Sequence, residues 1–248
     1  FVKVGLAQDV IFSQFYKNPL YMNPALTALE TCGRTYLNYR NASTGPFEQN
    51  VYSLGFDVPF KSTNLGLGGL FQWQEEGLKR TGIFGFQFSR KVPITPDVFV
   101  SMGMEGGGIY TTWNTADMKL PSDIAQTNTS AGQPEIPSSF TYNLAAGAGL
   151  SYKTHYAGFA VRHLTAPYIK TVNLNVQIHR KYTGHYGARI PYKMQGSKNG
   201  YLAPQVIFIS QNGNNSLTTG VYGIYNKIGA GVYMRAHFPF QTSFLIIM

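Results

Sequence analysis

The sequence predicts an all-β protein, an antiparallel transmembrane β-barrel of the outer-membrane type with an irregular N-terminal segment. Many short stretches alternate apolar and polar residues, and a period of two is the pattern of a β-strand with two different faces. Charged residues are only 12% of the chain and aromatic residues 15%, whereas soluble domains carry roughly 25% charged residues. No run approaches the roughly 18 apolar residues of a membrane helix, so a bilayer-spanning chain of this kind must close its strands into a barrel.

The clearest alternation lies between residues 140 and 165. Its first strand has an apolar face with aromatic residues at both ends, formed by Phe140, Tyr142, Leu144, Ala146, Ala148, Leu150 and Tyr152. Membrane strands present such a face to lipid, and they need roughly 9 to 11 residues to cross. A tight turn at 153–155 then reverses the chain, and Ala157, Phe159 and Val161 continue the apolar face. This region is predicted to be a membrane hairpin.

Similar alternation divides most of the chain into strands. About twelve are expected, near 34–41, 51–58, 64–74, 81–90, 98–111, 139–152, 156–165, 181–190, 201–210, 216–225, 228–237 and 242–248. Lipid-facing positions include Phe84, Phe86 and Phe88 in the fourth strand and Met102 and Met104 in the fifth. The strands that begin at 201 and 242 are apolar on both faces, so their orientation stays open.

The N-terminal part divides into two pieces. Residues 1–7 end in Gly5-Leu6-Ala7, a small-x-small pattern that predicts a remnant of an export signal. Residues 8–30 are rich in aromatic residues, Asn and Pro without a long alternation, and we expect an irregular segment that plugs or lines the barrel. Residues 31–248 form the predicted barrel.

Loop lengths give an orientation. If the N-terminus is periplasmic, the long connections 112–138 and 166–180 are extracellular and the short turns 59–63, 153–155 and 226–227 are periplasmic, as is usual for outer-membrane barrels. The connection near 191–200 is longer than this pattern expects. Lysines in the periplasmic connections predict a basic rim, or simply solvated turn lysines.

Charged residues on the strands are expected to face the lumen, because a charge facing lipid costs about 2 to 4 kcal/mol near the midplane. By alternation this set comprises Arg34, Arg40, Asp57, Glu105, Arg162, Arg189 and Arg235. The two carboxylates are outnumbered by guanidinium groups, which predicts ion pairs and bonds to backbone carbonyls. Such a network either stiffens a filled lumen or acts as a selectivity filter.

The sequence carries no pattern of catalytic, metal or cofactor chemistry. Cys32 is the only cysteine, and the five histidines lack ligand spacing. The glycine runs are not followed by a helix pattern or by Gly-Lys-Ser/Thr. The net charge of +9 is scattered rather than clustered as in nucleic-acid-binding proteins. We therefore expect no enzyme, no cofactor, no metal and no nucleic-acid partner.

Several motifs resemble those of one family. Gln8-Asp9, then Phe12-Ser13-Gln14-Phe15, then Asn18-Pro19 and Asn23-Pro24-Ala25 resemble the N-terminal signature of the PorP/SprF family. Further similar elements follow in the same order at 161–167, 180–187, 202–204 and 231–235. Two departures are Leu26-Thr27-Ala28 after the first motif and an end at Met248, where an aromatic residue is usual.

The resemblance implies an outer-membrane barrel of Bacteroidetes associated with the type IX secretion system and gliding motility, with about 14 strands in the complete protein. It also implies an accessory role, in which secreted surface proteins such as adhesins are helped to reach or stay on the cell surface through their C-terminal domains. Periplasmic components of the secretion or gliding machinery are further implied partners.

The leading functional hypothesis is therefore a non-enzymatic anchor. The loops 41–50, 112–138 and 166–180 would dock a secreted partner, with exposed apolar candidates at Trp113, Pro134, Ile136, Pro137, Tyr168 and Ile169. The alternative for these residues is that each loop packs on itself. Alternative functions are a transport channel or porin with an N-terminal plug, and a soluble β-sandwich with aromatic binding sites, such as a lectin.

Overall fold

The computed structural model describes residues 18–44, 47–114, 138–170, 175–193, 199–225, 228–238 and 241–247. Two short helical turns precede the strands: α1 (Pro19–Met22) and η2 (Pro24–Leu26). The strands are β1 (Arg34–Thr44), β2 (Phe47–Phe60), β3 (Leu65–Glu76), β4 (Lys79–Thr95), β5 (Val98–Trp113), β6 (Ser139–Tyr152), β7 (His155–Arg162), β8 (Tyr168–Lys170), β9 (Asn175–Gln177), β10 (Lys181–Ala188), β11 (Ile190–Lys193), β12 (Asn199–Gln211), β13 (Asn214–Tyr225), β14 (Ile228–Phe238) and β15 (Gln241–Ile247).

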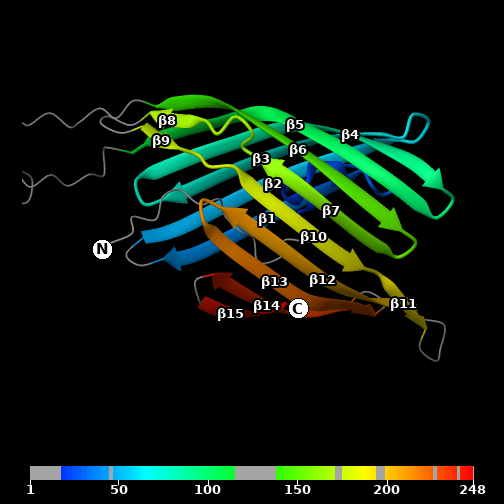
Figure 1. The fold of residues 1–248 in the computed structure, drawn as a ribbon. Coiled ribbons are helices and arrows are strands. Elements are labelled where there is room, and N and C mark those ends of the chain that lie inside the picture. The colour runs from blue at the N-terminus through cyan, green and yellow to red at the C-terminus, as the bar shows by residue number, and fades with distance from the viewer. Residues whose placement is uncertain are drawn as a thin grey trace, which may run out of the picture.

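The strands form one large antiparallel sheet and one small hairpin (Figure 1). The large sheet has 13 strands in the order β1-β2-β3-β4-β5-β6-β7-β10-β12-β13-β14-β15, and β11 pairs only with β12. The hairpin consists of β8 and β9. Each of the predicted alternating segments corresponds to one strand of the large sheet's order, which confirms the all-β antiparallel prediction.

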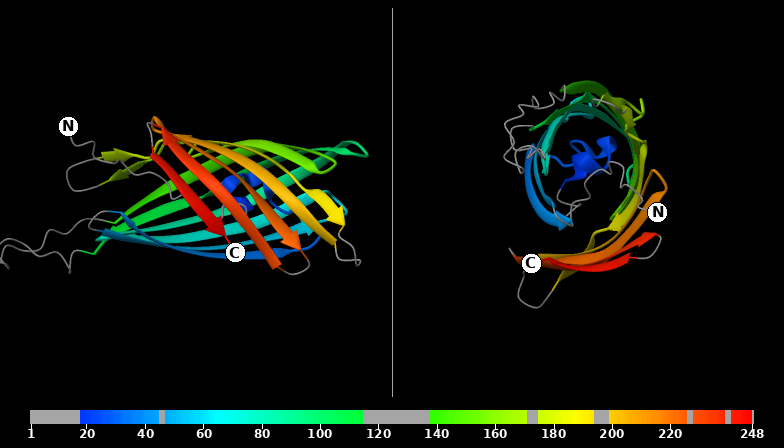
Figure 2. Two further views of the ribbon diagram at one scale, coloured as in Figure 1. Left: turned by 90° about the horizontal axis from the view of Figure 1, so that it is seen from below. Right: turned by 90° about the vertical axis from the view of Figure 1, so that its left-hand side faces the viewer.

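The large sheet curls around a central space, as a barrel wall does (Figure 2). Its end strands β1 and β15 are not hydrogen-bonded to each other in the described part of the chain. Inside the curve lie α1 and η2, which are drawn in blue within the ring in the end-on view. None of the helices that the structure describes is long and apolar enough to cross a membrane.

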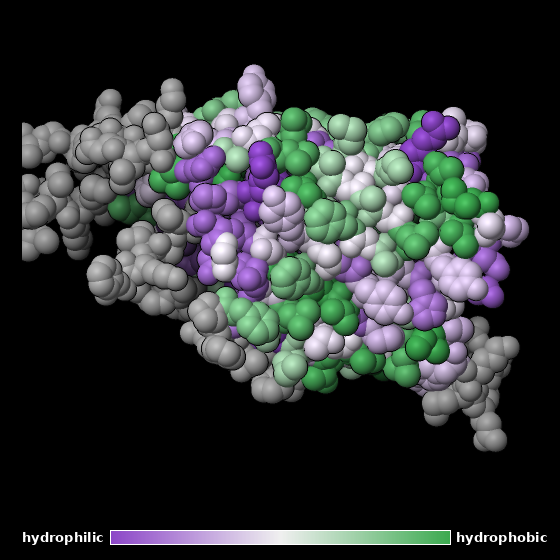
Figure 3. Space-filling model, in the orientation of Figure 1, coloured by the Kyte–Doolittle hydropathy of each residue, from purple (hydrophilic) through white to green (hydrophobic). Residues whose placement is uncertain are grey.

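The two faces of the sheet differ as the alternation predicts. Large apolar side chains cover the outer face; Phe86 is 71% exposed and Tyr142 75% exposed. Figure 3 shows such hydrophobic residues spread over the strands of one side of the molecule. The inner face instead carries polar and charged residues that are buried, such as Asp57, Gln87 and Glu105. A wall that is apolar outside and polar inside suits a bilayer.

Four local predictions differ from the structure. The docking loop expected at 41–50 is mostly strand, because β1 and β2 stay paired as far as Thr44 and Phe47. The strand expected at 156–165 ends at Arg162, because His163 adopts a left-handed φ of 56°. The strand expected at 181–190 breaks after Ala188. There β7 ends at the 153–154 turn, so β10 loses its partner on that side. The chain after the break, β11, pairs with β12 alone. The long connection expected at 166–180 contains the β8–β9 hairpin, where no strand was expected.

Candidate functional site

A short stretch after the N-terminal motif, residues 18–28, lies inside the curved sheet and is called the docked segment. Its two turns begin with Asn-Pro pairs, since Pro19 and Pro24 occupy first helical positions and an Asn caps each turn. Asn18 accepts from the Tyr21 N–H and donates from Nδ2 to Ser53 Oγ on β2, 3.0 Å away. The predicted motif residues Asn18, Asn23 and Pro24 are all buried here; Gln8, Asp9, Phe12, Ser13 and Gln14 lie outside the described residues.

Asn23 joins the docked segment to the opposite strands. Its Oδ1 accepts from the Ala25 N–H at 2.9 Å, which caps η2. Its Nδ2 donates to the backbone carbonyls of Ala148 on β6 and Phe159 on β7, and it contacts His185 Nε2 on β10 at 3.0 Å. A side chain that satisfies both its own turn and the barrel wall fixes where the chain crosses the lumen.

A buried ion pair holds the Leu20 carbonyl. Arg162 on β7 donates to both carboxylate oxygens of Glu105 on β5, at 2.9 and 2.7 Å, and to the Leu20 carbonyl at 2.9 Å. Gln87 on β4 donates to the same carbonyl and to Glu105. Arg162 is 1% exposed and Glu105 3%, so each charge depends on the other for compensation.

Tyr21 of the docked segment lies between cations. Lys181 Nζ on β10 donates to the Tyr21 hydroxyl at 3.0 Å and lies 4.1 Å from the ring centroid. The Arg162 guanidinium carbon lies 5.0 Å from the same ring. Both geometries permit cation–π attraction, which is stronger in a desolvated place.

The end of the docked segment is bound by the first strands. Thr27 donates to Gln87 Oε1 at 2.7 Å and accepts from Ser89 Oγ through its carbonyl. The Ala28 N–H donates to Asp57, which is fully buried and also accepts from Arg34 at 2.7 Å. The predicted lumen charges are thus brought together as two separate pairs, Arg34 with Asp57 and Arg162 with Glu105.

The other predicted lumen charges lie elsewhere on the inner side. Arg40 on β1 is half-buried. Arg235 on β14 is 6% exposed and donates to Thr218 Oγ1 at 3.0 Å. Arg189, just after β10, is exposed and forms an ion pair with Glu30 at 3.0 Å. Glu30 also lies 3.8 Å from Arg34, so it connects Arg189 to the Arg34–Asp57 pair.

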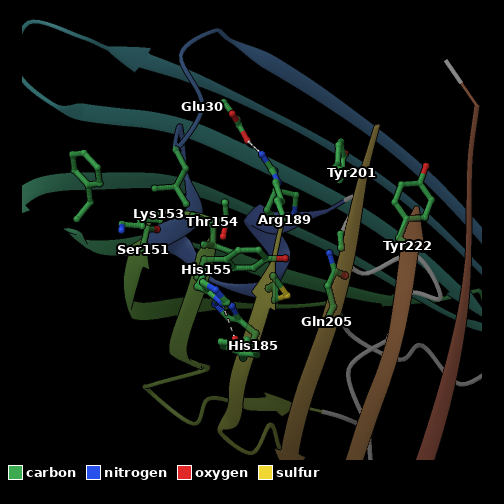
Figure 4. Close-up of a pocket in the computed structure, with 18 of the residues that line it drawn as sticks. Glu30, Ser151, Lys153, Thr154, His155, His185, Arg189, Tyr201, Gln205 and Tyr222 are labelled. Carbon is green, nitrogen blue, oxygen red and sulfur yellow. Dashed lines mark hydrogen bonds and ion pairs between the residues drawn. The ribbon is translucent and has the colours of Figure 1, made fainter. Parts of the chain in front are cut away.

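A cavity of about 580 Å³ lies beside the docked segment (Figure 4). Met22 and Leu26 of the docked segment line one side, and Ala203, Gln205 and Tyr222 of β12 and β13 line the other. Its mouth lies near the 153–154 turn, where Lys153, His155 and Arg189 line it. The docked segment therefore fills the lumen next to β2–β7 and leaves space next to β12 and β13.

His185 gives this cavity an unused donor. Because Asn23 Oδ1 accepts from a backbone N–H, its Nδ2 must face His185, and His185 Nε2 must be the acceptor. The neutral ring then carries its proton on Nδ1. That buried atom has no hydrogen-bond partner among the described residues, although His185 is only 6% exposed and lines the cavity.

The expected docking residues do not form one surface in the described structure. Tyr168 is 57% exposed, whereas its neighbour Ile169 is only 6% exposed. Ile169 packs with Ile83, Ile109 and Ile178 against the inner face of β4 and β5, so its expected exposure is wrong. Trp113 is half-buried at the end of β5. Pro134, Ile136 and Pro137 lie outside the described residues.

Sequence reasoning missed Glu30, Gln87, Lys181 and His185 as site residues. Strand alternation places the last three on the inner face, so a search that included polar and basic residues at inward positions would have found them. The described part of the chain contains no group of three or more His, Cys, Asp or Glu side chains arranged to hold a metal ion.

The comparisons with known proteins agree with the motif resemblance. Residues 4–248 match the family described as type IX secretion system membrane protein PorP/SprF. No curated protein and no solved structure gives a significant match. Because the match spans nearly the whole chain, this protein belongs to the PorP/SprF family of type IX secretion system membrane proteins.

Proposed function

We propose that this protein is a non-enzymatic outer-membrane accessory of the type IX secretion or gliding machinery, which holds secreted surface proteins such as adhesins at the cell surface. The N-terminus would be periplasmic, and the end that carries the β8–β9 hairpin and the 112–138 connection would be extracellular. Family membership supports the secretion role, and the apolar outer face supports a bilayer location.

The observation that carries the proposal is the docked segment. It is bound on several sides of the lumen, by Ser53 on β2, Gln87 on β4, Arg162 on β7 and Lys181 on β10. A segment tied to that many strands stiffens the wall and obstructs diffusion, as a platform requires. Residues 18–28 would thus act as an internal brace, and the extracellular loops would dock the C-terminal domain of the secreted partner.

The test is to replace the gene by variants in its own cells and to measure surface-bound adhesin with antibodies on intact cells. Removal of residues 114–137 should abolish retention while the barrel stays heat-modifiable on gels. Tyr168→Ser should reduce it, because this side chain is exposed beside the buried Ile169. Extraction in mild detergent should recover the adhesin with the wild type only. Normal surface adhesin in cells that lack the whole protein would contradict the proposal.

The cavity favours one alternative, a channel that opens when the docked segment moves. A disulfide can distinguish the two functions, because a Cβ placed at Gly149 lies 4.0 Å from the Ala25 Cβ, within the usual span of a disulfide. The variant would combine Ala25→Cys and Gly149→Cys with Cys32→Ser, and Ser101→Ala to make room beside position 149. An anchor should retain adhesin equally when oxidised or reduced and conduct no ions; a channel should conduct only when reduced.

A further inference from the structure

We propose that the cavity beside the docked segment binds a short acidic peptide segment of a partner protein, which enters from the end of the barrel that carries the 153–154 turn. This inference rests on the proposed function, which places that end in the periplasm. Three properties of the cavity support it: its size and lining, the charges near its mouth, and a buried hydrogen-bond donor.

The cavity has the size and lining of a binding site. Its volume of about 580 Å³ falls within the roughly 300 to 1,000 Å³ of typical ligand sites. The inward-facing tyrosines Tyr156, Tyr201 and Tyr222 line part of the wall. A tyrosine offers a broad apolar face together with a hydroxyl group, and it loses little conformational entropy on binding, so it suits peptide side chains and carbonyls alike.

The charges near the mouth favour an anion. The lining includes Arg34, Lys91, Lys153 and Arg189, and Glu30 is its only carboxylate among the described residues. Arg34 is already paired with Asp57 at 2.7 Å, so Glu30, which lies 3.0 Å from Arg189 and 3.8 Å from Arg34, is shared between two cations. Lys153 lies 3.9 Å from Asp97, a long distance for an ion pair, and both side chains are more than half exposed. This ion pair is therefore weak. Lys91 lies over the Phe99 ring. An incoming carboxylate would find cations that are incompletely neutralised.

The buried donor favours a peptide over a lipid. His185 Nδ1 lacks a partner among the described residues, and an unpaired buried N–H is costly. Gln205 also lines the cavity, where it accepts from the Tyr233 hydroxyl at 3.3 Å and is hydrogen-bonded to Tyr156. A backbone carbonyl can accept from His185 Nδ1 below the cationic mouth, whereas the acyl chain of a lipid cannot. Figure 4 shows His185, Gln205 and Tyr222 around the same space.

The experiment uses the full chain in detergent and fluorescence anisotropy in low salt, where charge effects are least screened. The probe is a pool of labelled octapeptides of Asp, Glu, Leu, Phe and Tyr; a second pool replaces Asp and Glu by Asn and Gln. We expect the acidic pool to bind at least about tenfold more tightly, the difference expected when two or more ion pairs form in a partly desolvated site.

Two matched pairs of variants locate the binding. Lys153→Glu should weaken it about fivefold, whereas Lys61→Glu, an exposed turn lysine at the same end that does not line the cavity, should change it by less than about twofold. Ala203→Phe should fill the cavity and weaken binding at least about tenfold, while Ala230→Phe on an exposed position of β14 should not. Heat-modifiable migration on gels checks that each barrel has folded, and Lys153→Glu tests the proposal without change to the packed wall.

Three results would overturn the inference: equal binding of the neutral pool, equal effects of Lys153→Glu and Lys61→Glu, or displacement of the acidic pool by phosphatidylglycerol vesicles. The first two would exclude an anion-selective site here, and the third would identify a lipid site. Surface adhesin is measured in the same variants. If peptide binding fails while loss of the protein still removes surface adhesin, only this inference falls and the proposed function stands.

Discussion

The two sides of the lumen are built differently. Next to β2–β7, the docked segment is held by specific polar contacts, in which buried charges such as Glu105 and Arg162 have charged partners. Next to β12 and β13, Met22 packs against an apolar cluster of Ala203, Ile207, Tyr222 and Tyr233, and the cavity remains open beside it. Directional contacts on the first side define one position for the segment. The second side borders the cavity, where we propose that a partner binds.

This difference implies that removal of contacts on the first side should release the segment, whereas changes on the second side should alter binding and leave the segment in place. The predictions below test this contrast. Three of them compare a change at the docking contacts with a control elsewhere, the last compares two residues of the β8–β9 hairpin, and they run from the largest expected effect to the smallest.

The largest effect is expected for Glu105→Ala. The change leaves the guanidinium of Arg162, which is 1% exposed, without its carboxylate, and loss of one partner of a buried pair typically costs about 3–5 kcal/mol. The free energy of unfolding is measured in urea, with heat-modifiable migration and tryptophan fluorescence as the two signals of unfolding. The control is Asp97→Ala, because Asp97 is exposed and lies 3.9 Å from Lys153; about 0–1 kcal/mol is expected there. Equal losses in the two variants would refute the special role of the buried pair.

Asn23→Ala should have the next largest effect. It removes the cap of η2 and the hydrogen bonds to Ala148, Phe159 and His185. The free energy of unfolding should fall by about 1–3 kcal/mol. Hydrogen exchange in residues 18–28 should accelerate strongly. Met22→Ala, on the cavity side of the same segment, should leave that exchange nearly unchanged. Faster exchange in Met22→Ala than in Asn23→Ala would invert the proposed contrast.

Gly147→Ala tests how closely the segment fits the wall. A Cβ at this position would collide with Asn23 Oδ1, and overpacking of this kind costs about 1–3 kcal/mol. Gly184→Ala is the control, because a Cβ there meets no atom within 4 Å. Proteolysis of the folded barrel should become faster within residues 18–28 for Gly147→Ala alone. Protection in both variants would show that the Asn23 side chain moves aside without cost.

Much of this arrangement follows from local sequence. Alternation places Asp57, Glu105 and Arg162 on the inner face. The opposite register would turn all three charged side chains towards lipid, where a charge is costly. The partners across the lumen could not be predicted, since the docked segment has no alternation and binds through backbone groups such as the Leu20 carbonyl and the Ala28 N–H. Any residue has these groups, so no pattern of side chains reveals them.

The burial of Ile169 was unpredictable for a related reason. In a three-residue strand, Tyr168 and Ile169 point to opposite sides, and both are apolar enough to face either way. The choice depends on Ile83 and Ile109, which are distant in sequence and lie on the inner wall of β4 and β5. The hairpin thus covers the inner face with apolar contacts, in contrast to the polar contacts of the docked segment.

The smallest effect tests that contrast at the hairpin. Ile169→Val removes one methylene group from a cluster in which Ile169 is 6% exposed, and this should cost about 0.5–1.5 kcal/mol. Tyr168→Phe removes a hydroxyl from a residue that is 57% exposed, and we expect a change within about 0.5 kcal/mol. Hydrogen exchange of the β8–β9 amides measures both, and only Ile169→Val should accelerate it. Exchange within residues 18–28 should stay constant in both variants, because the apolar cluster and the polar docking contacts involve different side chains; coupled acceleration would show that the hairpin and the docked segment open as one unit.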